Sequence, residues 1–451
     1  MDKLLQILEE KMTPIAVKLE QNRYLSAVKN SFMAAMPLLI IGSFFILLAY
    51  LPINAYTEFM LNTFGADWQR MFTIPNNISM SMMTVYVVVG MGNELSQSYN
   101  LDRMAGIFAA LASFFVVTPM HAFAEEGLGI GIPLGNLGAA GLFVGILISI
   151  ISIEIIRFTD KMGWTIKMPD SVPQNVSKSF SALIPVALVI IFFNFVRIGF
   201  EQTSYGDVQT FIFNNLQTPL TALGSTLPAT IVVLIIEGIL WSFGLHGANI
   251  VGSVMSPIWL TLTADNATAL AAGDVLPNIV TSQFYNNFIK IGGSGATFGL
   301  CLLLLFAAKS KQFKALGKLS IGPEIFTINE SIIFGMPIVL NPIMIVPFLL
   351  APLVMAIVAY FSMSTGLVPL TNGVNIPWTT PPVIAGFLVS GWRGAVLNIV
   401  QIGLSAAIYF PFFKVADNLA VKEELENESE IQSFESIDYY RLVYNENIIS
   451  Y

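Results

Sequence analysis

The stretch AVKNSFMAAMPLLIIGSFFILLAYL, at residues 27–51, decides the class of fold. It is almost entirely apolar and long enough for a helix that crosses a bilayer, which needs roughly 20 such residues. It starts too far from the N-terminus and runs too long for a signal peptide, so we expect it to remain in the mature protein. The sequence therefore places at least one helix in a membrane.

The rest of the chain repeats this pattern. Of its 451 residues, 55% are hydrophobic and only 11% are charged, whereas charged residues make up about 25% of a soluble domain. About ten runs have the length and apolarity of a spanning helix, which predicts an all-α polytopic membrane protein. The expected spans lie near residues 27–51, 77–97, 104–121, 137–158, 180–199, 227–246, 295–310, 338–361 and 393–413, with further apolar stretches near 250–263 and 380–390.

Lysine and arginine gather in alternate loops, and this predicts the orientation because cytoplasmic loops are enriched in both. We expect three basic segments in the cytoplasm: the one before the first span, the loop after the fourth span, and the loop just before residue 320. The N-terminus is then cytoplasmic. The basic residues of these segments are Lys3, Lys11, Lys18, Arg23 and Lys29; Arg157, Lys161, Lys167 and Lys178; and Lys309, Lys311, Lys314 and Lys318.

A basic, proline-interrupted segment, WTIKMPDSVPQNVSKSF at residues 164–180, separates two halves of the chain. We expect a transmembrane bundle over residues 1–175 and a second transmembrane half over residues 176–415. The acidic remainder, 416–451, has too little periodic apolar content to span and is expected to be a solvated, mobile cytoplasmic tail. Ionisable groups within spans fall mainly in the second half, so we expect the chemistry there.

The first polar interruption is LPATIVVLIIEGILWSFGLHGANI, residues 227–250, which carries Glu237, Trp241, His246 and Asn249. An ionisable group at membrane depth needs a cavity or a partner, and the glycines beside the histidine loosen the helix there. The histidine is either a sugar-binding group or a helix-end residue bonded to a carbonyl. Glu237 fits a structural buried acid whose partner the sequence does not reveal.

The second interruption is FIKIGGSGATFGL, residues 288–300, which contains Ser294 and Thr297. Non-helical backbone at membrane depth occurs only where protein or a water-filled cavity covers it, and transporters use such segments to present polar groups. This predicts a re-entrant loop, and a glycine-rich packing surface between helices is the alternative. The segment is not a nucleotide-binding loop, because no Gly-Lys pair follows it.

The third interruption is SIGPEIFTINESIIFGMPIVLNP, residues 320–342, in which Asn329 and Glu330 lie among glycines and prolines. We interpret it as a second re-entrant segment, with Glu330 near the cytoplasmic face. A structural acid satisfied by nearby amides is the alternative. The fourth interruption, VNIPWTTPP at residues 374–382, offers Trp378, whose indole suits either stacking on a sugar or anchoring at the membrane interface.

Together these groups predict a cavity for a neutral polyol. They offer hydrogen bonds but no arginine cluster for an anion and no carboxylate ring for a cation. The two histidines and single cysteine, Cys301, exclude a multi-histidine or cysteine metal site, and we expect no metal, cofactor or nucleic acid. A sugar transporter is the inference. The candidate substrate-binding residues are His246, Asn249, Ser294, Thr297, Asn329 and Trp378, with Glu330 as the candidate catalytic residue.

Five motifs resemble one family: the membrane component, enzyme IIC, of the bacterial phosphoenolpyruvate-dependent sugar phosphotransferase system, in its lactose, cellobiose and chitobiose branch. Within it, the chain looks most similar to cellobiose and N,N′-diacetylchitobiose members. The resemblance implies a homodimer formed by the N-terminal half, with about ten spanning helices and two re-entrant hairpins per protomer. The motifs are INESIIFGMPIVLNP, FGLHGAN, IGGSGATFGL, WTTPPVIAGFL and IKMPDSVPQNVSKSF.

The resemblance also implies roles for individual residues. Glu330 would accept the C6 hydroxyl of a β-linked disaccharide, His246 would bond other hydroxyls, and Trp378 would line the cavity. A cytoplasmic partner, enzyme IIB, would supply the phosphoryl group, since Cys301 lies in an apolar run and no phosphorylated Cys or His is expected in this chain. Serine at position 331 replaces the proline usual in the family, which leaves the rigidity of the hairpin in question.

Two other functions stay open from the residues. A proton-coupled secondary sugar transporter would use Glu330, Glu237 and His246 as a proton relay. An intramembrane glycosyl or acyl transferase is weaker, because the sequence has no donor-binding motif. Cellobiose and diacetylchitobiose both remain as substrates, since the pocket contacts that would choose between them cannot be placed from sequence.

Overall fold

The structure is a computed structural model that describes residues 18, 21–50, 54–122, 129–169, 171–336, 338–339, 341 and 343–446. Within these residues the fold is helical, apart from one two-stranded antiparallel hairpin. Its strands are β1 (His121–Ala122) and β2 (Ile130–Gly131), with His121 opposite Gly131.

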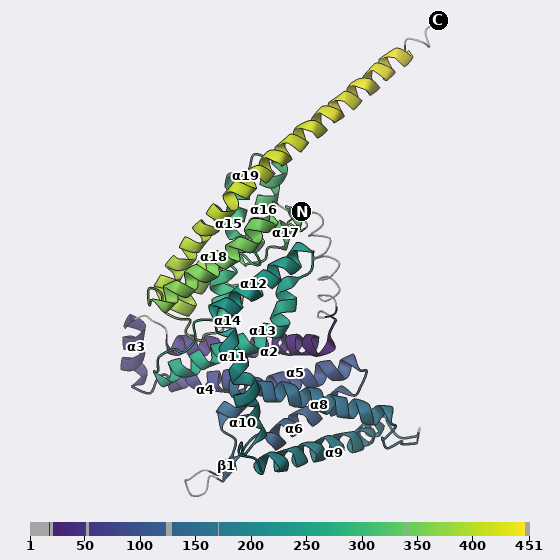
Figure 1. Cartoon of the computed structure of the whole chain (residues 1–451), viewed down its shortest axis with the longest axis vertical. Helices are drawn as coiled ribbons and strands as arrows, with labels where there is room; N and C mark the ends of the chain where they lie inside the picture. The colour runs from purple at the N-terminus through teal and green to yellow at the C-terminus, as the bar shows by residue number, and fades with distance from the viewer. Residues whose placement is uncertain are drawn as a thin grey trace.

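Most of the helices up to residue 201 pack around one buried apolar cluster, which includes Leu39, Met91, Phe114 and Ile148. They form the lower part of the molecule in Figure 1, in purple to teal. Their apolar faces meet in this cluster. The helices are α2 (Arg23–Ala49), α3 (Asn54–Phe64), α4 (Arg70–Ser79), η1 (Met80–Met82), α5 (Met83–Ser98), α6 (Arg103–Val117), α7 (Leu134–Leu137), η2 (Ala139–Gly141), α8 (Leu142–Lys161) and α9 (Gln174–Glu201).

Helices of the C-terminal half are more often interrupted, and two of them are short π-helices. Two buried clusters hold them, one around Leu300, Met344 and Phe348 and the other around Phe284 and Phe288. The elements are α10 (Val208–Ile212), the π-helix η3 (Phe213–Gln217), α11 (Thr218–Gly224), α12 (Leu227–Ser242), α13 (Gly247–Ala272), α14 (Ser282–Phe284), the π-helix η4 (Tyr285–Ile289), α15 (Phe298–Phe306), α16 (Lys311–Ile325), α17 (Glu330–Gly335), α18 (Ile345–Ser364) and α19 (Pro382–Glu446).

Five helices of the described residues are long and apolar enough to cross a membrane, and a bent pair adds a sixth if it counts as one span. This confirms the helical membrane class but not the predicted total of ten spans. A span over 295–310 is wrong, because α15 covers only 9 residues, about 13 Å of helix against a hydrocarbon core of about 30 Å. The six are Arg23–Gly42, Ala139–Lys161, Val176–Glu201, Ile345–Ser364, Pro382–Glu426, and the pair Val208–Gly224 with Leu227–Ser242, bent by 76°.

Buried amide side chains support the irregular backbone of the C-terminal half. The Nδ2 of Asn398 donates to the carbonyl of Asn287 at 2.9 Å, and the Nε2 of Gln401 donates to that of Phe288 at 2.6 Å. Both amides are fully buried on α19. Since a π-helix displaces carbonyls from regular pairing, such donors remove the cost of burying them unsatisfied.

Helix α19 bends at Ser390 and Gly391 and then continues to Glu446 without a break at residue 416, where the tail was expected to begin. In Figure 1 it extends in yellow beyond the rest of the molecule. Two of its carboxylates bind the chain at and just before the start of α16. Asp417 accepts from the backbone N–H groups of residues 309 and 310, and Glu424 accepts from those of 311 and 312.

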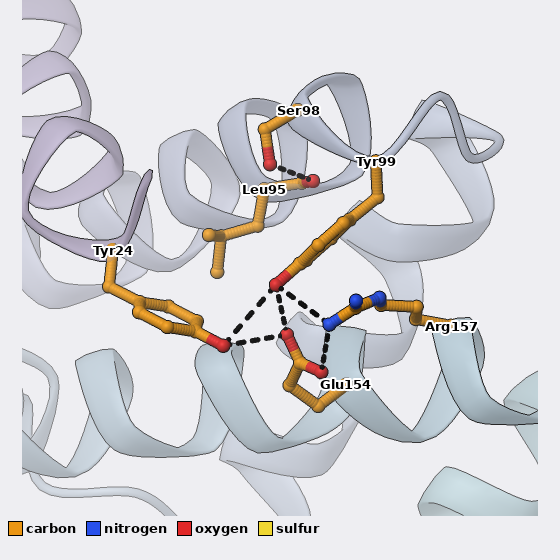
Figure 2. Close-up of polar contacts among 6 residues, drawn as sticks. All are labelled: Tyr24, Leu95, Ser98, Tyr99, Glu154 and Arg157. Atoms are coloured by element: carbon orange, nitrogen blue, oxygen red, sulfur yellow. Dashed lines mark hydrogen bonds and ion pairs between the residues drawn. The ribbon is translucent and has the colours of Figure 1, made fainter. Parts of the chain in front are cut away.

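A polar cluster joins α2 and α8 to the end of α5 in the N-terminal half (Figure 2). One carboxylate oxygen of Glu154 accepts from the hydroxyls of Tyr24, at 2.9 Å, and Tyr99. Arg157 pairs with the other oxygen at 2.9 Å, and its guanidinium lies 4.2 Å from the centre of the Tyr99 ring. Arg23 lies 4.4 Å from the same ring. The Tyr99 hydroxyl is therefore the point at which three segments meet.

Replacing Tyr99 with phenylalanine is expected to lower the free energy of unfolding by about 1 kcal/mol, the size of a partly exposed hydrogen bond to a charged group. Denaturant unfolding of the purified protein in detergent measures this. Tyr205→Phe is the matched control, because the described residues offer its exposed hydroxyl no hydrogen bond. Equal losses in the two variants would contradict the importance of the cluster.

Candidate functional site

His246 lies at the break between α12 and α13, as the flanking glycines predict. Gly244 has φ +76°, which ends α12, and His246 is the N-cap of α13. Its Nδ1 accepts the backbone N–H of Asn249 at 3.2 Å. A ring nitrogen that accepts carries no proton, so the neutral imidazole holds its proton on Nε2 and offers it as a donor.

That donor faces Glu330, the first residue of α17. Nε2 of His246 lies 3.9 Å from Oε1 of Glu330, with 38% and 47% of the two side chains exposed. The gap is too long for a direct hydrogen bond but lets a hydroxyl bind both groups at about 2.8 Å. Oε2 of Glu330 has no hydrogen-bond partner within the described residues. The Trp241 ring stands 4.5 Å from the imidazole and closes one side.

The segment from residue 290 to 297 is buried and non-helical, which confirms the irregular backbone predicted for it. Gly293 has φ +92° and Gly295 has φ +81°. A Cβ on Gly293 would lie 2.6 Å from the Asn329 side chain, and one on Gly295 would lie 2.2 Å from the Phe348 ring. Glycine is therefore required here both by the backbone conformation and by the close approach of neighbouring elements.

Three predicted substrate-binding residues use their polar groups inside the protein. Asn329 Nδ2 donates to the carbonyl of Ser294 at 2.6 Å and to Oγ1 of Thr297 at 2.8 Å, and the Ser294 hydroxyl donates to Glu237 at 2.9 Å. All three are buried, at 6% exposure or less. They hold the segment 290–297 against the chain just before Glu330, and they leave no free donor aimed at a ligand.

The other two predicted residues are more open. Asn249 is exposed in the first turn of α13, and Trp378 is 43% exposed. The backbone carbonyl of Trp378 accepts from Thr327 Oγ1 at 2.7 Å, which ties it to the segment that leads to Glu330. The site thus combines His246, Glu330 and Trp241, with Trp378 linked to it through the backbone.

Glu237 has the partners that the sequence did not reveal. Lys290 Nζ lies 2.8 Å from its Oε1, and the Tyr285 hydroxyl donates to its Oε2. The acid is buried and the lysine is mostly buried, with 5% and 14% of their side chains exposed. The only signal in the sequence was a lysine inside an apolar run, and a pair 53 positions apart cannot be deduced from that. The contacts fit a structural acid, because both oxygens are occupied.

Comparison with known proteins identifies the family of the chain. The family "Phosphotransferase system, EIIC" matches residues 29–352. The crystal structure of the transporter ChbC, the IIC component from the N,N′-diacetylchitobiose-specific phosphotransferase system, superposes with a TM-score of 0.89 at 40% identity. The superposition covers 93% of this chain and 99% of the ChbC chain.

Curated relatives match over nearly the whole chain. The lichenan permease IIC component of Bacillus subtilis (strain 168) is 42% identical over 433 residues, 94% of this chain and 96% of that protein. The cellobiose-specific EIIC component of Geobacillus stearothermophilus is 41% identical over 435 residues, 94% and 96% of the two chains. The lactose-specific EIICB component of Streptococcus mutans is 30% identical over 440 residues, 93% of this chain and 74% of that protein. The chain therefore belongs to the phosphotransferase system EIIC family, as an integral-membrane sugar permease of the cellobiose, chitobiose and lichenan type.

Proposed function

We propose that this permease binds a β-linked disaccharide of the cellobiose or diacetylchitobiose class, carries it across the bacterial cytoplasmic membrane, and presents its C6 hydroxyl to Glu330. A cytoplasmic EIIB then phosphorylates that hydroxyl. The names of the relatives support the substrate class, since they refer to lichenan, cellobiose and diacetylchitobiose. EIIC components work with a sugar and an EIIB, as the EIICB relatives suggest.

The 3.9 Å gap between His246 and Glu330 carries this proposal. A sugar hydroxyl both donates and accepts, so it can donate to the carboxylate while it accepts from Nε2–H of the imidazole. The oxygen then attacks the phosphoryl group: a new O–P bond forms, the bond between phosphorus and the EIIB carrier breaks, and the hydroxyl proton passes to Glu330. Phosphoryl transfer depends mainly on such positioning.

The remaining parts of the proposal concern assembly. The half formed by residues 1–175 makes the homodimer, residues 176–415 hold the sugar between two re-entrant segments, and the polar residues after 416 face the cytoplasm with the N-terminus. Basic side chains near α16 support a cytoplasmic location for the approach to Glu330. Asn249 and Trp378 line the sugar path, whereas Ser294, Thr297 and Asn329 act by holding the backbone beside it.

Membrane vesicles that contain this chain test the proposal. They are supplied with radiolabelled cellobiose or diacetylchitobiose, cytoplasmic extract and phosphoenolpyruvate, and the chemical form of the accumulated sugar is determined. Sugar 6-phosphate that appears only with phosphoenolpyruvate and the soluble proteins is expected. Accumulation of unmodified sugar under a pH gradient alone would replace the proposal with proton-coupled transport.

Replacing His246 with alanine is expected to weaken disaccharide binding about tenfold, because one hydrogen bond to a hydroxyl is lost. Equilibrium binding of radiolabelled sugar to the purified protein measures this. His121→Ala is the matched control: it removes the chain's other histidine, which is exposed in β1. Unchanged affinity in the His246 variant would remove this residue from the sugar site.

A further inference from the structure

Glu324 is a buried acid that the proposed function does not use. It lies in the last turn of α16, shortly before Glu330, and its side chain is fully buried. The titratable groups that face it are Cys301 on α15, Tyr409 on α19 and Glu330, and none of them is a cation. Burial, reinforced by the negative charge of Glu330, raises the pKa of Glu324 well above its usual range.

The Thr297 hydroxyl touches three groups, and its hydrogen-bonding capacity decides which of them donate. The carbonyl of Gly292 lies 2.7 Å away, Oε1 of Glu324 lies 2.8 Å away, and Nδ2 of Asn329 lies 2.8 Å away. A hydroxyl has one proton and two lone pairs. The carbonyl can only accept, so it takes the proton, and the amide can only donate, so it fills one lone pair.

The second lone pair of Thr297 then faces Glu324, and two acceptors at that distance would repel. We propose that Glu324 is held as a neutral carboxylic acid whose O–H donates to Thr297. Every hydrogen-bonding position of the hydroxyl is then filled.

Two further features support a neutral acid. Oε2 of Glu324 has no hydrogen-bond partner in the described part of the chain, and burying an unpaired carbonyl oxygen costs far less than burying an unpaired charged one. The acid also lies directly against the backbone of Gly292, where a Cβ would stand 2.3 Å from Oε1. The site accommodates the carboxyl group closely but supplies nothing that would stabilise a charge on it.

This neutral acid positions Glu330. It fixes Thr297, Thr297 fixes the Asn329 side chain, and Asn329 directly precedes Glu330 in the chain. Glu324 touches no substrate and acts through these two residues, so it is a positioning residue. The functional part of this inference rests on the proposed role of Glu330, whereas the protonation of Glu324 does not.

Infrared difference spectroscopy tests the protonation directly. Spectra of the full-length protein in lipid at neutral pH are compared between the wild type and Glu324→Gln. A protonated carboxylic acid band that is present in the wild type and absent from the variant is expected. Glu58→Gln is the matched control, because Glu58 is exposed on α3 and its loss removes a carboxylate band. If the wild type shows a carboxylate band that is absent from Glu324→Gln, Glu324 is ionised and the inference is overturned.

The positioning role is tested by sugar 6-phosphate formation. Glu324→Leu, which cannot donate to Thr297, is expected to lower kcat about tenfold with little change in KM. Glu324→Gln, whose amide donates in place of the O–H, is expected to restore most of the rate. Wild-type kcat in the leucine variant, or no rescue by glutamine, would overturn the positioning role. If the leucine variant fails to fold, the glutamine variant still tests both claims: it should keep most of the wild-type kcat, and its infrared spectrum should lack the carboxylic acid band. Normal turnover in Glu330→Gln would instead refute the proposed function and leave the infrared result standing.

Discussion

Replacing Glu330 with glutamine is expected to lower the rate of sugar 6-phosphate formation by a factor of about 10² to 10⁴, the range that general acid–base catalysis contributes. Glutamine has nearly the same shape and can still accept a hydrogen bond from the sugar, so binding should change little. It cannot take the hydroxyl proton, because a neutral amide oxygen is a very weak base. The loss should therefore fall on kcat.

The measurement is phosphoenolpyruvate-dependent phosphorylation of radiolabelled disaccharide in vesicles, with sugar binding measured separately. Glu58→Gln serves again as the control, since it removes an exposed carboxylate on α3. Normal phosphate formation by the Glu330 variant would eliminate the role proposed for this residue. Loss of binding without any change in kcat would make Glu330 a binding group only.

Replacing Lys290 with methionine is expected to destabilise the protein by about 3–5 kcal/mol, the cost of leaving a buried charge without its partner. Lys290 Nζ and Glu237 Oε1 are 2.8 Å apart, Glu237 is buried and Lys290 is mostly buried. Methionine fills much of the volume of the lysine stem, so the effect should come from charge. Lys290 Nζ also lies 4.4 Å from the centre of the Tyr285 ring, and the variant loses this cation–π contact too.

A double variant separates the lost pair from lost packing. Glu237→Gln removes the charge and keeps one oxygen that accepts from one of the two hydroxyls of Tyr285 and Ser294, while its amide N–H donates to the oxygen of the other. Glu237→Gln/Lys290→Met should therefore recover most of the stability lost by Lys290→Met. Thermal unfolding in detergent compares the single and double variants. A double variant as unstable as Lys290→Met alone would show that the ion pair is not the cause.

The sequence predicted the helical membrane class and singled out His246 and Glu330, which the fold brings to within 3.9 Å of each other. Long apolar runs can be recognised without knowledge of the tertiary structure, and the glycines beside His246 indicate a broken helix from the local sequence alone. For Ser294, Thr297 and Asn329, the sequence could not show how their polar groups are used. Their composition shows that they can form hydrogen bonds, but only the fold shows that each donor is already used within the protein.

Two other differences have similar causes. The apolar run over 295–310 has the composition of a span, but the positive φ of Ala296 delays the helix to Phe298, and it ends at Phe306. The serine at position 331 lies in the first turn of α17, where the backbone N–H has no acceptor within the helix. Proline is tolerated at such a position, so serine there is compatible with the same local structure.

The two carboxylates of α19 that bind the chain at the start of α16 have a mechanical consequence. Asp417 and Glu424 bind four successive backbone N–H groups, from residues 309 to 312. Such charge-assisted bonds hold α19 and the start of α16 firmly together. Because α16 ends only a few residues before Glu330, the protruding helix α19 is mechanically connected to the carboxylate that we propose receives the sugar.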